Sequence, residues 1–164
     1  MPETFDDILL LKSKGASDER GSFRKFFDES LLESVSFEIK QINHVETKAA
    51  HTLRGLHYQT GDHAEGKIFR VLNGSIQLGF FDTTSEKSGS LILDDVDKAY
   101  YVPRGYATGY LTLSRNTTVF YMSDNSYAPS HESGLRPNDP ILRIDWLNKT
   151  YHQSEKDKSW PNWK

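Results

Sequence analysis

Hydrophobic and polar residues alternate in short runs along most of the chain, and few stretches repeat with the period of a helix. Short runs rich in β-branched and aromatic residues, separated by turn residues, are typical of β-strands. Many short strands at nearly regular spacing indicate a β-sandwich or barrel. We expect strands at residues 37–45, 67–72, 75–81, 90–93, 99–102, 109–113 and 117–122.

Local signals add a turn, a helix and a packed tail. Asn73-Gly74 between two strands predicts a type I′ hairpin, because Asn-Gly supplies the two positive φ angles of that turn. Residues 28–34 predict one short helix with Asp28 as its N-cap. The tail from Ile144 onward contains all three tryptophans, and we expect it to pack over the sheets because exposing them would be costly.

Composition narrows the class of protein. The 164 residues are 36% hydrophobic and contain no repeat or Pro/Gly-rich linker, so we expect one domain over residues 1–164. A net charge of −3 argues against a nucleic-acid binder. No apolar run approaches the roughly 20 residues that span a membrane, and no secretory signal is evident. The absence of cysteine excludes disulfides and thiolate chemistry, and we expect a cytoplasmic protein.

The run Leu-Arg-Gly-Leu-His-Tyr-Gln at residues 53–59 holds the strongest candidate for chemistry. An unperturbed imidazole has a pKa of about 6.5, which makes a histidine such as His57 the natural base at neutral pH. Arg54 and His57 would lie on opposite faces of a regular strand, because faces alternate with period 2. Gly55 is therefore a candidate β-bulge that re-aims one of these side chains.

Three other residues are candidates for acid–base chemistry, but spacing alone does not decide their roles. Lys67 follows Gly66 at the start of a strand, where a solvated lysine is equally consistent. Tyr121 lies in an apolar run, where a core aromatic residue fits equally well. Asp157 lies in a charged segment typical of a surface turn.

Two stretches resemble the metal-binding motifs of cupin-type jelly rolls, but each lacks ligands. The first motif requires a second histidine two residues after the first, and here Gln59 holds that place after His57. The second ends in Pro-x-Gly-x-x-His, and here Pro103-Arg104-Gly105 is followed by Thr108. A catalytic metal normally takes three protein ligands, so we expect no metal.

The chain resembles the dTDP-4-dehydrorhamnose 3,5-epimerase family over nearly its whole length. The most specific signature is Arg-Gly-Leu-His-Tyr-Gln at residues 54–59. The other matching segments follow in order at residues 18–23, 41–44, 66–67, 73–76, 102–107, 121–129, 138–140 and 154–157. The resemblance implies an all-β, single-domain jelly roll with a few short helices. It also implies a homodimer and an enzyme that uses no cofactor.

The resemblance also implies a reaction. The family inverts C3 and C5 of a nucleotide-linked 4-keto-deoxy sugar for deoxysugar and cell-surface polysaccharide biosynthesis. His57 would remove the proton and Asp157 would orient its imidazole. Lys67 would stabilise the enolate oxygen, and Tyr121 would return a proton from the opposite face.

The same resemblance implies a set of substrate-binding residues. Arg20 and Arg54 match positions that bind the diphosphate, where arginine offers bidentate hydrogen bonds. Gln41, Asn43 and Tyr127 would line the sugar site or its edge. The remaining members of the expected set are Phe23, Gln59 and Thr108.

Departures from the family pattern concern specificity. Thr108 replaces a histidine that normally lies beside the sugar, Arg24 or Lys25 replaces a glutamate, and Asp82-Thr83-Thr84 lacks an arginine. Alternatives therefore stay open: a single-site epimerase of a GDP- or CDP-linked 4-keto sugar or heptose, or a non-catalytic sugar-nucleotide-binding jelly roll. A ketoisomerase of related fold would not be expected to carry residues 54–59 as they stand.

Overall fold

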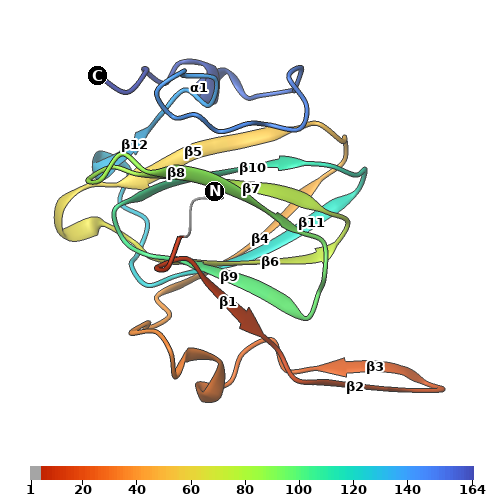
Figure 1. Cartoon of the computed structure of the whole chain (residues 1–164). Helices are drawn as coiled ribbons and strands as arrows, with labels where there is room; N and C mark the ends of the chain where they lie inside the picture. The colour runs from red at the N-terminus through yellow and green to blue at the C-terminus, as the bar shows by residue number, and fades with distance from the viewer. Residues whose placement is uncertain (1–4) are drawn as a thin grey trace.

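A computed structural model of the chain describes residues 5–164 and shows two five-stranded sheets packed face to face, with a separate hairpin (Figure 1). The all-β sandwich expected from the sequence is confirmed. The first sheet has the order β1 (Leu9–Lys12), β9 (Lys98–Val102), β6 (Lys67–Asn73), β11 (Thr117–Ser123) and β4 (Gln41–Thr47). The second has the order β12 (Glu132–Gly134), β5 (Leu53–Gln59), β10 (Tyr106–Thr112), β7 (Ile76–Asp82) and β8 (Ser88–Leu93).

The remaining elements are short. The hairpin consists of β2 (Gly15–Asp18) and β3 (Gly21–Arg24), and it projects from the body of the sandwich (Figure 1). One helical turn, α1 (Glu155–Lys158), lies against the second sheet, and three 3₁₀ turns are η1 (Glu29–Leu32), η2 (Gly61–His63) and η3 (Pro129–His131). Within residues 5–164, no helix has the length and apolar character needed to cross a bilayer.

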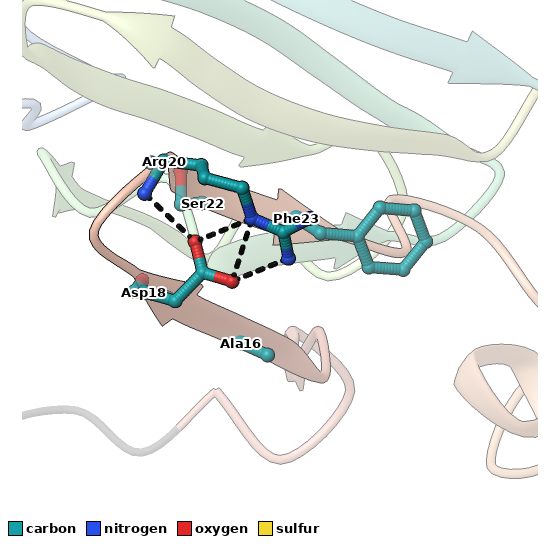
Figure 2. Close-up of a pocket in the computed structure, with 7 residues that line it drawn as sticks. Ala16, Asp18, Arg20, Ser22 and Phe23 are labelled. Atoms are coloured by element: carbon teal, nitrogen blue, oxygen red, sulfur yellow. Dashed lines mark hydrogen bonds and ion pairs between the residues drawn. The ribbon is translucent and has the colours of Figure 1, made fainter.

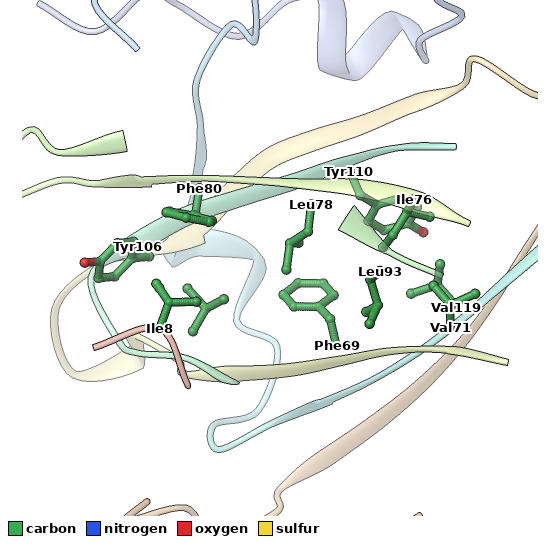
Figure 3. Packing of buried hydrophobic residues seen from close by; sticks show 11 residues of the cluster. Ile8, Phe69, Val71, Ile76, Leu78, Phe80, Leu93, Tyr106, Tyr110 and Val119 are labelled. Atoms are coloured by element: carbon green, nitrogen blue, oxygen red, sulfur yellow. The ribbon is translucent and has the colours of Figure 1, made fainter. Parts of the chain in front are cut away.

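The main core fills the space between the two sheets. Phe69 of β6 and Val119 of β11 meet Leu78 and Phe80 of β7 there, and all four side chains are buried (Figure 3). Alternate residues of each strand point inward, so the period-2 pattern of the sequence is what supplies this core.

The C-terminal tail covers the outer face of the second sheet, as its tryptophans predicted. Trp146 is buried and its indole N–H donates to the carbonyl of Pro137 at 2.9 Å. Its ring lies directly over Gly79 of β7, where a side chain would have no room. This packing brings the last residues of the chain back to β5.

The predicted hairpin at Asn73-Gly74 is wrong. The strands on either side, β6 and β7, belong to different sheets, and of the two turn residues only Gly74 has a positive φ, at 85°. The turn therefore crosses between layers. A local dipeptide signal cannot distinguish such a crossing from a hairpin, because strand pairing here is decided by non-local packing.

Several element boundaries also differ from expectation, among them those of β8, which begins at Ser88, and of β10, which begins at Tyr106. The strand expected at residues 37–45 begins only at Gln41. The predicted helix is a 3₁₀ turn, η1, although Asp28 caps it as expected by accepting a hydrogen bond from the amide of Leu31.

Candidate active site

The bulge predicted at Gly55 is present on β5. Thr108 of β10 pairs with His57 and Tyr110 pairs with Arg54, so two residues of β5 lie opposite the single residue Gly109 of β10. Gly55 has a φ of 106°, which an L side chain rarely adopts. The extra residue lets Arg54 and His57 both line one cavity, which a regular strand would not allow.

The two backbones approach each other closely at this bulge. A Cβ atom on Gly55 would lie 2.6 Å from the carbonyl oxygen of Thr108, and one on Gly109 would lie 2.6 Å from that of Arg54. Both distances are too short for real contacts, so glycine is required on each strand.

His57 is held by Asp157, which comes from α1. Ser154 caps this turn by accepting a hydrogen bond from the Asp157 amide. Asp157 Oδ1 lies 2.6 Å from His57 Nε2, and Oδ2 accepts a hydrogen bond of 3.2 Å from the amide of Gly55. An ionised carboxylate only accepts hydrogen bonds, so Nε2 carries the proton and Nδ1 keeps a free lone pair.

The environment keeps Asp157 ionised although its side chain is buried. Burial opposes ionisation, but the hydrogen bond and charge of His57 and the amide of Gly55 outweigh it, so the pKa of Asp157 lies below its ordinary value. A negative charge at this position stabilises the imidazolium that forms when His57 accepts a proton.

Lys67 is buried and does not extend into solvent. It begins β6 in the first sheet, across the cavity from His57, and its Nζ lies 3.5 Å from Thr108 Oγ1 and 3.0 Å from Glu65 Oε1. The sequence analysis missed Glu65. Its place two residues before Lys67 was the available signal, since alternate residues of an extended segment point to the same side.

Tyr121 lies on β11 of the first sheet, where its ring packs on that of Phe69 with centroids 5.4 Å apart. Burial and the negative charge of Glu65 raise the pKa of the Tyr121 hydroxyl. The group is therefore protonated at neutral pH and can act as a proton donor.

These side chains meet in one cavity of about 230 Å³ between the sheets. His57 enters it from the second sheet, whereas Lys67 and Tyr121 enter it from the first. The expected site residues that line it are Arg54, His57, Lys67, Thr108, Tyr121 and Asp157. Sequence analysis did not single out two further lining residues, Tyr110 and Lys156.

A second cavity of about 80 Å³ adjoins the first and shares His57, Lys67 and Tyr121 with it. The expected residues Gln41, Gln59 and Tyr127 line it.

Gln59 is largely occupied with holding loops, because its amide N–H groups donate to the carbonyls of His63 and Ser126 and its oxygen accepts from the amide of Ala128. Asn43 lies beside Tyr121 in the register of β4 and β11.

Arg20 and Phe23 do not lie at this site within the chain. Both belong to the projecting hairpin, and neither lines the cavities around His57. Figure 2 shows Arg20 lying against Asp18, with two side-chain nitrogens and the backbone amide bonded to that carboxylate. The Phe23 side chain is largely exposed, at 67%. Sequence position alone did not reveal this separation.

Among residues 5–164, no three histidine, aspartate or glutamate side chains are arranged to hold a metal ion.

Comparison with known proteins identifies the family. The sequence profile of dTDP-4-dehydrorhamnose 3,5-epimerase matches residues 2–164. The chain belongs to the dTDP-4-dehydrorhamnose 3,5-epimerase family. A member of the family from Methanothermobacter thermautotrophicus is 30% identical over 96% of this chain and 90% of its own length.

Solved structures of family members agree with the fold. The dTDP-4-dehydrorhamnose 3,5-epimerase of Bacillus anthracis, crystallised with TDP and pyrophosphate, has a TM-score of 0.92 and 32% identity and covers 99% of this chain and 98% of its own. An epimerase from Legionella pneumophila in complex with dTDP-4-keto-L-rhamnose has a TM-score of 0.89 and 26% identity. The match covers 98% of this chain and 89% of the Legionella chain.

Proposed function

We propose that this member of the family is a cofactor-independent epimerase that inverts C3, C5 or both in a nucleotide-linked 4-keto-deoxy sugar, for deoxysugar and cell-surface polysaccharide biosynthesis. The observation that carries the proposal is the placement of the His57–Asp157 pair opposite Lys67 and Tyr121 across one cavity. Family membership over residues 2–164 supports the same activity and supports one domain for the whole chain.

The proposed reaction begins with removal of a proton. A ketone at C4 acidifies the hydrogens on C3 and C5, because the electron pair left on carbon delocalises onto the oxygen as an enolate. His57 Nδ1 takes the proton, and Asp157 stabilises the resulting imidazolium. Lys67 donates to the enolate oxygen, and a preorganised donor of this kind contributes roughly 3–4 kcal/mol in comparable sites.

Inversion follows from the arrangement of base and acid on opposite walls. Tyr121 lies on the first sheet and His57 on the second, so a sugar ring between them presents opposite faces to the two groups. Tyr121 gives its proton to the carbon as the enolate collapses to the ketone. The high proton affinity of the buried phenolate then favours its reprotonation, while His57 releases the proton it took.

Arg54 is the proposed diphosphate ligand, because it lines the cavity beside the reacting groups and can offer paired hydrogen bonds. Bound TDP and dTDP-4-keto-L-rhamnose in two related structures support a dTDP-linked substrate. Thr108, which lies 3.5 Å from Lys67 where the family has histidine, bears on whether C3, C5 or both are inverted. A nucleotide-linked sugar is a metabolite of the cytoplasm, where we place the activity.

We propose further that the protein is a homodimer. In Figure 1 the β2–β3 hairpin projects on the opposite side of the molecule from β5, which carries His57. Arg70 anchors the base of this projection by donating to Ser13 Oγ at 2.6 Å and to the carbonyl of Phe26 at 3.3 Å. If Arg20 and Phe23 bind substrate, they do so at the site of a second copy of the chain.

Deuterium exchange tests the proposed activity. We expect incubation in D₂O with a dTDP-linked 4-keto-6-deoxy sugar to place deuterium at C3, C5 or both, as read by NMR. Exchange at one carbon would support the single-site alternative, and GDP- and CDP-linked sugars tested in parallel would identify another nucleotide. His57→Asn should abolish exchange at every carbon. Binding without exchange for every sugar tested would instead support a non-catalytic binding protein.

A further inference from the structure

No aliphatic residue of the described part of the chain lines the second cavity, which lies beside Lys67. Besides the shared His57, Lys67 and Tyr121, it is lined by Glu65 and Glu132, by Ser123 and by glutamine and tyrosine side chains. The first cavity, by contrast, includes Val45 and Phe69. A methyl group placed in the second cavity would remove water from two carboxylates without replacing its hydrogen bonds, which is costly. A hydroxyl group would replace the hydrogen bonds that water makes to these carboxylates.

Glu65 is the carboxylate closest to the reacting groups. Its side chain is 11% exposed, and one oxygen lies 3.0 Å from Lys67 Nζ. Glu132, the other carboxylate, already accepts hydrogen bonds from Tyr127 and Lys156. Because Glu65 lies beside Lys67, the proposed ligand of the C4 carbonyl, it is better placed than Glu132 to accept a hydrogen bond from a group next to C4.

Ser123 supplies an independent observation. It is the last residue of β11 and pairs in register with Lys67 of β6. Its hydroxyl is buried and, within residues 5–164, has no hydrogen-bond partner. A buried polar group without a partner costs free energy. Ser123 is among the residues that line the second cavity, and it lies two positions after Tyr121 on β11, so the two side chains belong to the same face of the sheet.

The position of this cavity relates it to particular atoms of the sugar. With the diphosphate on C1 at Arg54 and the C4 carbonyl at Lys67, the second cavity lies beyond C4. The substituents that reach it are those on the two carbons flanking the carbonyl, namely the oxygen on C3 or the group at C6.

We propose that Glu65 and Ser123 are specificity-determining residues that bind a hydroxyl group of the sugar on a carbon flanking the C4 carbonyl. This rests on the proposed function. The preferred substrates are then 4-keto sugars that keep this hydroxyl, and analogues lacking it are discriminated against because Glu65 and Ser123 are left unpaired.

Two pairs of nucleotide-linked 4-keto sugars test the proposal. One pair differs only by the hydroxyl on C3, and the other only by the hydroxyl on C6. We expect the wild-type chain to favour the hydroxylated member of one pair by at least about tenfold in kcat/KM for deuterium exchange at whichever carbon, C3 or C5, the enzyme exchanges. The pair that shows the preference identifies the bound hydroxyl, and no preference in either pair overturns the proposal.

The variants are Ser123→Ala and Glu65→Gln, with Glu38→Gln, at a side chain 80% exposed, as control. Ser123→Ala should reduce the preference by about five- to tenfold, the effect of one hydrogen bond, and should not lower the Tm because no protein partner is lost. Glu65→Gln should reduce it several-fold, and the control should leave it unchanged. Equal losses on both members of a pair would show that the residues support Lys67 or the fold, and would overturn the assignment.

Calorimetric binding of the same sugars keeps this proposal separate from the proposed function. Selective binding without exchange would support the hydroxyl subsite and contradict the epimerase activity. Exchange without selectivity would support the activity and contradict the subsite.

Discussion

Replacing Tyr121 should separate proton removal from inversion of configuration. We expect Tyr121→Phe to lower the rate of inversion by at least about 100-fold, because the donor on one face is lost. Deuterium exchange with retained configuration should persist, since His57 still removes and returns the proton. NMR of the product sugar in D₂O measures both rates. Tyr151→Phe, at a half-buried tyrosine outside both cavities, is the control, and parallel loss of exchange and inversion in Tyr121→Phe would contradict the assignment.

Asp157 links the site to the pH dependence of stability. Burial opposes its ionisation, but the hydrogen bonds from His57 and Gly55 lower its pKa in the folded chain. A carboxyl of this kind stabilises the fold above its unfolded pKa of about 3.9, and the contribution is lost as the pH falls through the folded value. The unfolding free energy of the wild type should therefore fall more steeply below about pH 4 than that of Asp157→Asn.

Urea unfolding at several pH values between about 2.5 and 6 measures this difference. Asp145→Asn, at a side chain 92% exposed, should keep the slope of the wild type. Identical slopes for the wild type and Asp157→Asn would contradict the lowered pKa.

At the residue scale, the sequence named candidate side chains but could not predict their surroundings. Spacing did not decide whether Lys67 was solvated, whereas the structure shows it buried against Glu65 and Thr108. The sequence around Asp157 is typical of a surface turn, whereas in the structure α1 places Asp157 against His57. Burial of these groups depends on elements distant in the sequence, which local patterns do not encode.

The bulge is the element that sets the geometry of the site. Gly55→Ala combines a positive φ with a backbone clash, so we expect it to lower the unfolding free energy by about 3 kcal/mol or more and to abolish exchange. Gly105→Ala is the matched control, since its φ of 89° is also positive but the space around it is open. It should cost only about 1–2 kcal/mol. Urea unfolding measures both, and equal losses would show that the close approach to Gly109 is unimportant.

At the element scale, features that depend on a single residue were predicted more reliably than features that depend on which strands pair. Gly55 predicted the bulge and Asp28 predicted a helix cap, because each acts through its own backbone or nearest amides. Asn73-Gly74 predicted a hairpin that does not form, since β6 and β7 find their partners elsewhere in the chain.

At the scale of the whole molecule, the proposed homodimer makes a quantitative prediction. Light scattering should give a mass near twice the 18.8 kDa of the chain. If the hairpin serves the partner's site, His57→Asn and Arg20→Ala should each be inactive alone. Mixed and refolded together, they should recover about a quarter of the wild-type activity, because half of the dimers are mixed and each of these has one intact site.

Wild type mixed with His57→Asn is the control and should retain only the activity of its wild-type chains. No recovery in the first mixture, with a dimeric mass, would contradict a contribution of Arg20 across the interface.

The overall sandwich and the packed tail followed from strand periodicity and from the burial demand of the tryptophans. The assignment of strands to sheets could not be predicted. β6 hydrogen-bonds with β11 and β9, whereas β7, which follows it in the chain, belongs to the other sheet.

The contact between His57 and Asp157 spans one hundred residues and closes only when α1 folds onto β5. A chain still being translated can contain every strand of both sheets while its histidine lacks its carboxylate. Turnover would then begin only after Asp157 has been added and α1 has folded, because a chain that stops before residue 157 lacks the carboxylate that orients His57.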